Sequence, residues 1–236
     1  MNLIILVEAD FQGGTRVAVL HGRRALHIQK VLRAGVGTVL RVGLLNGPVG
    51  NGTLVAQTES HVELEVELSE NEPSVQHGTL IVALPRPKSL KRVLQVAAAF
   101  GLERIVLMES WRVEKSFWGS PLLQTTELNE QLILGLEQGC GTRLPEITVR
   151  RRFRPFAEDE LPRLSSGKLA LLAHPGSAAL CPAHVNQPFC LALGPEGGWT
   201  SFEVDLFTKA GFAPVHLGNR ILRVEHAAPA FLGRLV

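Results

Sequence analysis

The chain has 236 residues, of which 45% are hydrophobic and 19% are charged, and this composition excludes a disordered or fibrous protein. This length allows one large domain or two modest ones, with a core that needs neither disulfides nor metals. The net charge of +2 neither excludes nor favours an acidic partner, so the placement of the charges matters more.

The first residues are apolar but too few to form a signal peptide or a membrane span. Only residues 2–7 precede the acidic Glu8 and Asp10, and no basic stretch comes before them. We therefore expect a cytoplasmic protein with no membrane partner.

Residues 1–74 are predicted to form a small β-barrel with one helix. His61–Leu68 alternates between apolar and polar residues, which is typical of a strand with one buried face. Asn46-Gly47-Pro48 and Asn51-Gly52 predict turns between neighbouring strands. The expected strands are Thr15–Leu20, Thr38–Leu45, Gly52–Thr58 and His61–Leu68, and the expected helix is Arg23–Leu32.

Basic residues are concentrated in two parts of the chain. Residues 1–58 contain six (Arg16, Arg23, Arg24, Lys30, Arg33 and Arg41) against two acids, whereas residues 59–72 contain six acids and no base. Four more arginines lie within 150–154. Such clusters suit an RNA phosphate backbone, although each is equally consistent with a solvated surface.

After a polar linker at Ser69–His77, strands and helices alternate through residues 75–236. Ser89 is expected to cap a helix that ends at Gly101, and Thr200-Ser201-Phe202-Glu203 is a capping box that begins another helix. Wholly apolar strands that alternate with helices predict an α/β fold with a parallel sheet covered on both faces. The expected strands are Thr79–Leu84, Ile105–Met108, Leu169–Ala173, Phe189–Leu193 and Val215–Leu217, and the later helices are Glu127–Gln138, one from Thr200 to Gly211, and Val224–Leu235.

The cysteines and histidines do not predict a metal site. Cys140, Cys181 and Cys190 contain no C-x-x-C pair, so we expect small, buried, reduced side chains. The histidines show no metal-ligand spacing, and His174 is more consistent with a structural role than with a ligand.

Three loops that follow predicted strands indicate a ligand site. They are residues 174–177 (HPGS), 194–198 (GPEGG) and 218–223 (GNRILR). Ligands of open α/β sheets bind at the carboxyl ends of strands, and glycine lets them approach the main chain. Neither a Walker A sequence nor the Gly-x-Gly-x-x-Gly spacing is present, which favours a nucleoside over a phosphate group.

The two glycine segments, residues 193–198 (LGPEGG) and 217–225 (LGNRILRVE), closely resemble those of the bacterial 16S rRNA (uracil-N3)-methyltransferase family, RsmE. The resemblance covers nearly the whole chain. Its other segments are residues 27–33 (HIQKVLR), 84–88 (LPRPK), 111–117 (WRVEKSF), and Glu137-Gln138 with Arg143-Leu144-Pro145.

The resemblance implies a PUA-like RNA-binding barrel in residues 1–74 and a SPOUT trefoil-knot methyltransferase domain in residues 75–236. It implies a homodimer that uses S-adenosylmethionine to methylate N3 of a uridine in 16S rRNA, free or in the small ribosomal subunit. The cofactor-binding residues that it implies are Leu172, His174, Leu193, Gly194, Pro195, Glu196, Gly197, Gly198, Leu217, Gly218, Asn219, Ile221, Leu222 and Arg223.

Three side chains are candidates for catalysis. Glu225 and Glu196 are candidate bases for the uracil N3 proton, and Arg223 is a candidate for stabilising the uracil oxyanion. A carboxylate near a helix start, like Glu225, is also favourable without any catalytic role. Glu196 alternatively holds its loop by accepting from main-chain amides, and Arg223 alternatively binds phosphate.

Basic residues in the matching segments are predicted to contact RNA. They are Arg23, Arg24, Lys30, Arg33, Arg86, Lys88, Arg112, Lys115 and Arg143. Trp111, Trp118 and Trp199 could stack on a base, but core packing is the stronger expectation for each.

The chain departs from the family pattern at several positions. Val224 and His226 stand where many members have threonine, Phe100 replaces a leucine before Gly101, and residues 2–4 lack the usual arginines. Two rival hypotheses remain open: a related enzyme acting on tRNA or on a different atom, and a non-catalytic RNA-binding protein of the same fold.

Overall fold

The computed structural model describes residues 2–236, and their contacts divide the chain into two units. Unit 1 comprises the chain up to Ser74 together with Leu136–Leu144, and unit 2 comprises Val75–Gly135 and Pro145–Val236. This grouping differs from the predicted division of the chain in one respect, because residues 136–144 belong with the N-terminal unit.

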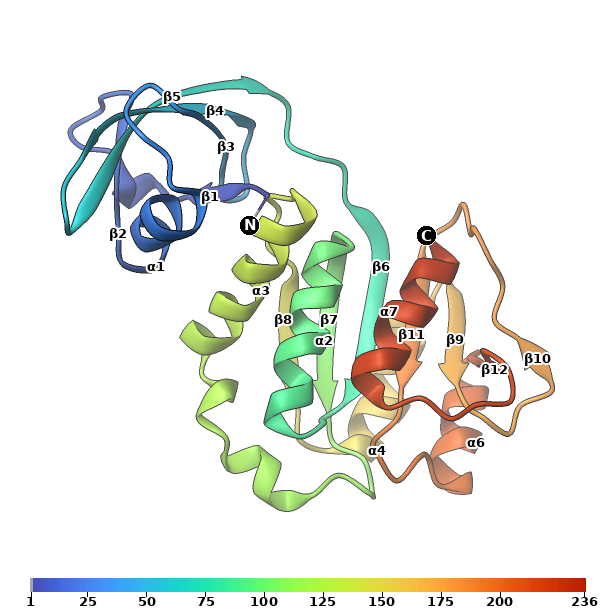
Figure 1. Cartoon of the computed structure of the whole chain (residues 1–236). Helices are drawn as coiled ribbons and strands as arrows, with labels where there is room; N and C mark the ends of the chain where they lie inside the picture. The colour runs from blue at the N-terminus through green and yellow to red at the C-terminus, as the bar shows by residue number, and fades with distance from the viewer. Residues whose placement is uncertain (1) are drawn as a thin grey trace. The chain divides into compact units, whose positions relative to one another are not determined.

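Unit 1 contains a curved five-stranded sheet in the order β1-β3-β4-β5-β2 (Figure 1). The β1–β3 pair is parallel and the other pairs are antiparallel. The strands are β1 (Ile4–Leu6), β2 (Val17–His21), β3 (Val39–Leu44), β4 (Val49–Gln57) and β5 (His61–Glu70). Strand β1 was not predicted, because it lies within a short apolar run, residues 3–7, that shows no alternation.

Apolar and polar residues alternate along β5, and its apolar side chains contribute to the core of unit 1, as predicted. Val62, Leu64 and Val66 are buried, whereas Glu65 and Glu67 are exposed. Strand β5 continues to Glu70, so the polar linker is shorter than its composition suggested.

The predicted helix of unit 1 has two parts. Helix α1 (Gly22–Leu26) continues as a π-helix at His27–Leu32, which ends at Arg33 in the left-handed conformation (φ 52°). A 3-10 turn lies at Glu8–Asp10. This turn contains Asp10, whose Oδ2 accepts a hydrogen bond from Arg24 Nη1 at 2.6 Å.

Unit 2 is built on a seven-stranded sheet in the order β10-β12-β9-β11-β6-β7-β8, and every pair in it is parallel. Its strands are β6 (Gln76–Ala83), β7 (Leu102–Met108), β8 (Glu146–Arg150), β9 (Leu169–Ala173), β10 (Ala179–Leu180), β11 (Phe189–Leu193) and β12 (Ala213–His216). The prediction of an α/β fold with a parallel sheet is therefore confirmed.

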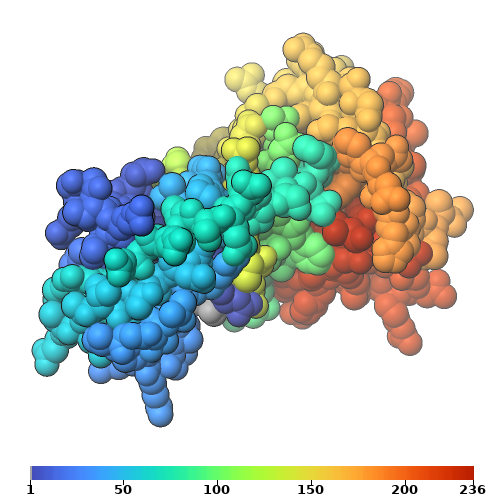
Figure 2. All heavy atoms as spheres, turned by 90° about the horizontal axis from the view of Figure 1, so that it is seen from above, coloured from blue at the N-terminus to red at the C-terminus, as the bar shows by residue number. Residues whose placement is uncertain are grey.

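Helices connect these strands, and α2 and α7 lie side by side against the sheet (Figure 1). The helices are α2 (Pro87–Ala99), α3 (Thr125–Gly139), α4 (Phe153–Pro155), α5 (Leu161–Ser165), α6 (Ser201–Lys209) and α7 (Val224–Leu235), with a π-helix at Phe156–Glu160 and 3-10 turns at Lys115–Gly119 and Pro121–Leu123. Figure 2 shows the end of α7 at the surface of unit 2, beside the segment after β10. Arg234 near the end of α7 donates a hydrogen bond from Nε to Cys181 O in that segment.

Two local expectations were wrong. Ser89 does not cap α2: Arg86 is the N-cap residue, Pro87 begins the helix, and Ser89 lies buried in its first turn. Proline is well suited to the first helical position because it has no amide to satisfy there. Cys140 is exposed rather than buried, at a left-handed position just after α3, whereas Cys181 and Cys190 are buried as expected.

No helix in the described part of the chain combines the length and apolar character that a membrane crossing would require. Among residues 2–236, the histidine, cysteine and acidic side chains nowhere form a group of three that could hold a metal ion.

Candidate functional site

Three adjacent strands of unit 2 bring the glycine-rich loops together. Strands β12, β9 and β11 are neighbours, with Val215 opposite Ala173 and Ala192 opposite Leu172. Because the strands are parallel, the loops after them leave the sheet at the same edge. They enclose a cavity of about 560 Å³, a size typical of small-molecule sites.

Most of the predicted cofactor residues line this cavity. Those that do are His174, Leu193, Gly194, Pro195, Glu196, Gly197, Gly198, Leu217, Gly218, Ile221, Leu222 and Arg223. Two predicted residues do not line it: Leu172 is wholly buried within β9, and Asn219 is exposed on the loop. The structure therefore brings the three predicted loops together around one cavity, and their binding of a cofactor stays a prediction.

Several wall residues were not among the predicted cofactor residues, although Pro175 and Arg220 lie in the predicted loops. They are Arg86, Ala173, Pro175, Trp199, Val215, His216, Arg220, Val224, Ala227 and Phe231. Arg86 comes from the loop after β6, and Ala227 and Phe231 from α7. A sequence pattern gives no sign of these contributions, because they depend on how distant elements pack.

Trp199 forms a fixed wall of the cavity. Its indole Nε1 donates to Ala173 O at 3.1 Å, and only 6% of the residue is exposed. A Cβ atom at Gly194 would lie 3.0 Å from the Trp199 ring, so glycine is needed there for the two to pack. The expectation of a packing role is confirmed for Trp199.

Positive φ angles explain two of the glycines. Gly198 has φ +71° and Gly218 has φ +118°, a conformation that side chains rarely adopt. A Cβ atom at either would meet nothing within 4 Å, so bare backbone faces open space at both positions. The Gly218 amide donates to His216 Nδ1 at 2.9 Å, which fixes the start of the loop.

The loop after Gly218 holds backbone donors that the protein does not use. Among the hydrogen bonds of the described chain, none is donated by the backbone amides of residues 219–223. Four residues of this segment, Arg220, Ile221, Leu222 and Arg223, line the cavity. Free main-chain donors beside an apolar wall suit a nucleoside, whose base offers ring nitrogens as acceptors.

The two candidate carboxylates lie in different environments. Glu196 is exposed at the cavity wall, and its Oε1 accepts a single long bond of 3.3 Å from the Arg86 amide. Glu225 is buried in the first turn of α7 and does not line the cavity.

Glu225 is held as a carboxylate. Burial alone would raise its pKa, but its own amide, the Ser89 hydroxyl and the positive charge of Arg86 outweigh burial and lower the pKa. Arg86 Nε also bonds Ser89 Oγ at 3.3 Å, so these three side chains form one network. A carboxylate with a lowered pKa is a weak base, which favours the structural alternative for Glu225.

Three of the basic residues predicted to bind RNA form ion pairs within unit 1. Arg23 binds the buried Glu137 at 2.7 Å, Arg24 binds Asp10, and Arg143 binds Glu72 at 3.0 Å. These guanidiniums therefore stabilise the fold, whatever else they contact. Lys30 and Arg33 of the same unit are exposed and outside any ion pair that the structure describes.

Two of the basic residues predicted in unit 2 are at or beside the cavity wall. Arg86 lines it, and the exposed Arg112 donates from Nη1 to Gly197 O at 2.6 Å. Lys88 and Lys115 are exposed.

The expectation of core packing is wrong for Trp111. Its side chain is 85% exposed in the loop after β7. Trp118 is half-buried beneath the Arg151 guanidinium, which lies 5.2 Å from the ring centre.

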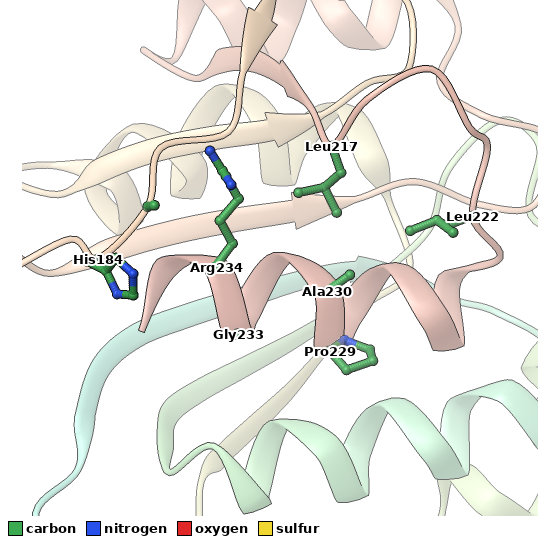
Figure 3. A pocket seen from close by; sticks show the side chains of 8 residues that line it. His184, Leu217, Leu222, Pro229, Ala230, Gly233 and Arg234 are labelled. Atoms are coloured by element: carbon green, nitrogen blue, oxygen red, sulfur yellow. The ribbon is translucent and has the colours of Figure 1, made fainter.

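A second, more open cavity of about 620 Å³ lies along α7 (Figure 3). Its residues from the helix are Pro229, Ala230, Gly233 and Arg234, with His184 at one end. Leu217 and Leu222 line both cavities, so the loop between them separates the two.

Comparison with known proteins agrees with this geometry. The sequence profile of the RNA methyltransferase domain matches residues 71–236. The chain is 33% identical to the ribosomal RNA small subunit methyltransferase E of Treponema pallidum, over 98% of this chain and 88% of that protein. It is 22% identical to the ribosomal RNA small subunit methyltransferase E 1 of Borreliella burgdorferi, over 98% and 95% of the two chains.

The fold is also similar to solved structures. The ribosomal RNA small subunit methyltransferase E of Neisseria gonorrhoeae, bound to S-adenosylmethionine, superposes with a TM-score of 0.75 at 22% identity, covering 98% of this chain and 95% of that one. The extent of the domain match and the identity to the Treponema protein lead to one conclusion: this chain belongs to the RNA methyltransferase family of ribosomal RNA small subunit methyltransferase E, RsmE.

Proposed function

We propose that this protein transfers a methyl group from S-adenosylmethionine to N3 of a uridine in the 16S rRNA of the small ribosomal subunit. Family membership supports RNA methylation, and the names of the relatives support small-subunit rRNA as the substrate. The observation that carries the proposal is the cavity at the ends of β9, β11 and β12, lined by bare glycine backbone and unused amides.

The residues present fit the cofactor. The cavity volume suits an adenosyl group, and residues 219–223 offer free main-chain donors to its base. Leu193, Leu217 and Leu222 provide apolar surface for the ring. When bound, S-adenosylmethionine supplies an electrophilic methyl group on a sulfonium centre.

This chain must then make uracil N3 a nucleophile. The N3–H group is a weak acid, so the nitrogen attacks only as its proton leaves. Glu196 is the better proton acceptor, because it lines the cavity with one weak hydrogen bond, whereas Glu225 is buried with a lowered pKa. A positioned base contributes about 10²–10⁴-fold, and alignment of the reacting atoms contributes more.

Arg223 and Arg86 both line the cavity and provide the positive charge that a uracil anion needs. As the proton leaves, negative charge spreads to the uracil carbonyl oxygens, and a guanidinium stabilises it by hydrogen bonding. The Arg86 amide also holds Glu196, so the acceptor and one cation are linked.

We further propose the arrangement that the family resemblance implies. Unit 1 acts as a PUA-like RNA-binding module, unit 2 carries a trefoil knot, and a homodimer is the active form. The exposed Lys30, Arg33, Lys88 and Lys115 contact the RNA backbone in this arrangement. Mixed parallel and antiparallel pairing in the curved sheet of unit 1 supports a barrel-like module.

Two measurements test the function. Calorimetry should detect S-adenosylmethionine binding, and its absence would favour a non-catalytic RNA-binding protein. Mass mapping of small-subunit nucleosides from a deletion strain should show the loss of N3-methyluridine, restored by the wild-type gene. Persistent N3-methyluridine, with another modification lost, would instead favour an enzyme for tRNA or for a different atom.

A further inference from the structure

Trp111 is the most exposed of the large hydrophobic side chains that the structure describes, at 85%. It follows β7 by three residues and lies in unit 2, whose other two tryptophans are buried or half-buried. An indole held in water loses the free energy that burial would contribute, so an indole this exposed indicates a binding role.

The backbone that carries this indole is firmly anchored. The Trp111 amide donates to Glu203 Oε1 at 2.9 Å, and the Ser110 hydroxyl donates to the same oxygen at 2.7 Å. Ser110 and Glu203 are each 1% exposed. The ring therefore projects from an anchored backbone, so only its two side-chain torsions remain to be ordered when a partner binds.

The anchored segment adjoins the cavity. Arg112 Nη1 bonds Gly197 O at 2.6 Å, and a Cβ atom at Gly197 would lie 3.1 Å from Arg112 Cδ. Gly197 lines the cavity, whereas Trp111 itself does not. Trp111 thus precedes a residue whose side chain contacts the cavity wall, and it lies outside the space that the cofactor and target base would share.

Basic residues lie within and beside the segment, and the charges of Lys115 and Arg151 both act on Glu109, two residues before Trp111. Because β7 and β8 are paired with Met108 opposite Arg150, the segment after β8 leaves the sheet beside Trp111's loop. Among the ion pairs of residues 2–236, none involves the exposed Arg112, Lys115, Arg151 or Arg152. Three acids lie in or beside this segment. Glu109 has its pKa raised by burial, Glu114 is exposed, and Glu203 is buried with its carboxylate bonded to Ser110 and to the Trp111 amide.

We propose that Trp111 is a stacking platform for an unpaired RNA base, one that flanks the nucleotide entering the cavity. An exposed aromatic ring on an anchored backbone, with basic residues beside it, is the combination that single-stranded nucleic acids recognise, since every base has a π-face. The inference rests on the proposed function for the identity of the ligand. It adds a residue that positions the RNA without touching the reacting atoms.

The test uses the full-length protein and a labelled single-stranded RNA that spans the mapped target uridine. Trp111→Ala should weaken RNA binding about 5- to 150-fold and raise KM for RNA, with little change in kcat or in cofactor affinity. Trp111→Phe should recover most of the loss, because stacking needs only a ring. Leu180→Ala is the matched control, since Leu180 is also an exposed apolar residue of unit 2, at 53%.

Abasic sites locate the stacked base. Removing the flanking base that stacks should weaken RNA binding to the wild type but not to Trp111→Ala. If the effect of base removal and the effect of Trp111→Ala were additive at every position, the proposal would be overturned. Unchanged affinity in Trp111→Ala would overturn it too, as would a loss confined to self-association in sedimentation. The binding assay does not depend on methyl transfer. RNA binding that depends on Trp111 in a protein that does not methylate would therefore reject the proposed function but not the stacking role of Trp111.

Discussion

Glu196 and Glu225 show how environment divides the roles of similar side chains. Glu196 is exposed on the cavity wall with one long hydrogen bond, and Glu225 is buried in a network with Ser89 and Arg86. Proton transfer requires access to the substrate and a pKa that permits uptake of the proton, and only Glu196 meets the first condition.

Replacement by glutamine separates the two roles. Glu196→Gln should lower the single-turnover methylation rate about 10²–10⁴-fold with an unchanged melting temperature, because it removes a proton acceptor. Glu225→Gln should instead lower the free energy of unfolding by about 1–2 kcal/mol, because a carboxylate bonded within a helix start is lost. Equal rate losses in both variants would contradict this division.

A side chain at Gly197 should block the cofactor. A Cβ atom there would lie 3.1 Å from Arg112 Cδ, so the branches of valine would displace that side chain and narrow the cavity. Gly197→Val should reduce S-adenosylmethionine affinity at least tenfold by calorimetry, with the fold retained in circular dichroism. The control Gly119→Val has no atom within 4 Å of its Cβ and should bind as the wild type does.

For single residues, the sequence predicts backbone conformation better than it predicts the exposure of side chains. The glycine segments required positive φ at Gly198 and Gly218, and that requirement is local. Trp111 was expected in the core, because an indole is usually buried and nothing beside it in the chain indicates otherwise. The ion pair of Arg24 with Asp10 was not predicted, because its partner is fourteen residues away in the chain.

Helix α6 depends on its first turn. Thr200 Oγ1 accepts from the Glu203 amide at 3.3 Å, while Glu203 accepts from the Thr200 amide at 2.7 Å, which is the predicted capping box. Glu203 also holds Ser110 and Trp111. One carboxylate therefore fixes both the helix start and the loop after β7.

This carboxylate makes stability dependent on pH. Burial alone would raise the pKa of Glu203, but hydrogen bonds from the Thr200 and Trp111 amides and from two hydroxyls lower it below 4.5. Its contribution is thus complete above pH 4.5 and is lost as pH falls through the lowered pKa. Urea denaturation should find Glu203→Gln about 1–3 kcal/mol less stable at pH 7. The gap should narrow as the pH falls through the lowered pKa of Glu203, and a constant gap would contradict the assignment.

Elements with a strong pattern were predicted accurately, and short ones were not. Strands β9 and β11 and helix α7 have the predicted bounds, since uniform apolar runs and helical spacing define them locally. Strands β1, β8 and β10 were missed, as were the short helical turns between residues 153 and 165. These segments take their form from the neighbours they pair with, which no local pattern contains.

At the scale of the whole molecule, residues 136–144 belong to unit 1 although they follow part of unit 2 in the chain, and composition could not predict this. Glu137 is 1% exposed, and its carboxylate accepts both guanidinium nitrogens of Arg23, at 2.7 and 3.0 Å. The amides of Asn2 and Leu3 both donate to Glu137 O. The end of α3 is thus tied to the first strand segment of the chain.

Removing Arg23 should destabilise unit 1, because Glu137 would remain buried without its cation. Arg23→Ala should lower the free energy of unfolding by about 1–3 kcal/mol, less than for a fully buried pair because Arg23 is 42% exposed. Denaturant titration measures this, with Arg33→Ala as an exposed control expected within about 0.5 kcal/mol of the wild type. Equal effects of the two substitutions would contradict the structural role of Arg23.

Because unit 1 includes residues 136–144, it cannot finish folding until that later segment has been synthesised. Residues 1–74 emerge from the ribosome first, yet the segment that completes their unit arrives only after Leu136–Leu144 has been translated. At roughly 5–20 residues per second, the nascent unit waits several seconds for its final part. During that interval its surface for residues 136–144 is uncovered, so this is the period in which a nascent-chain chaperone would protect it.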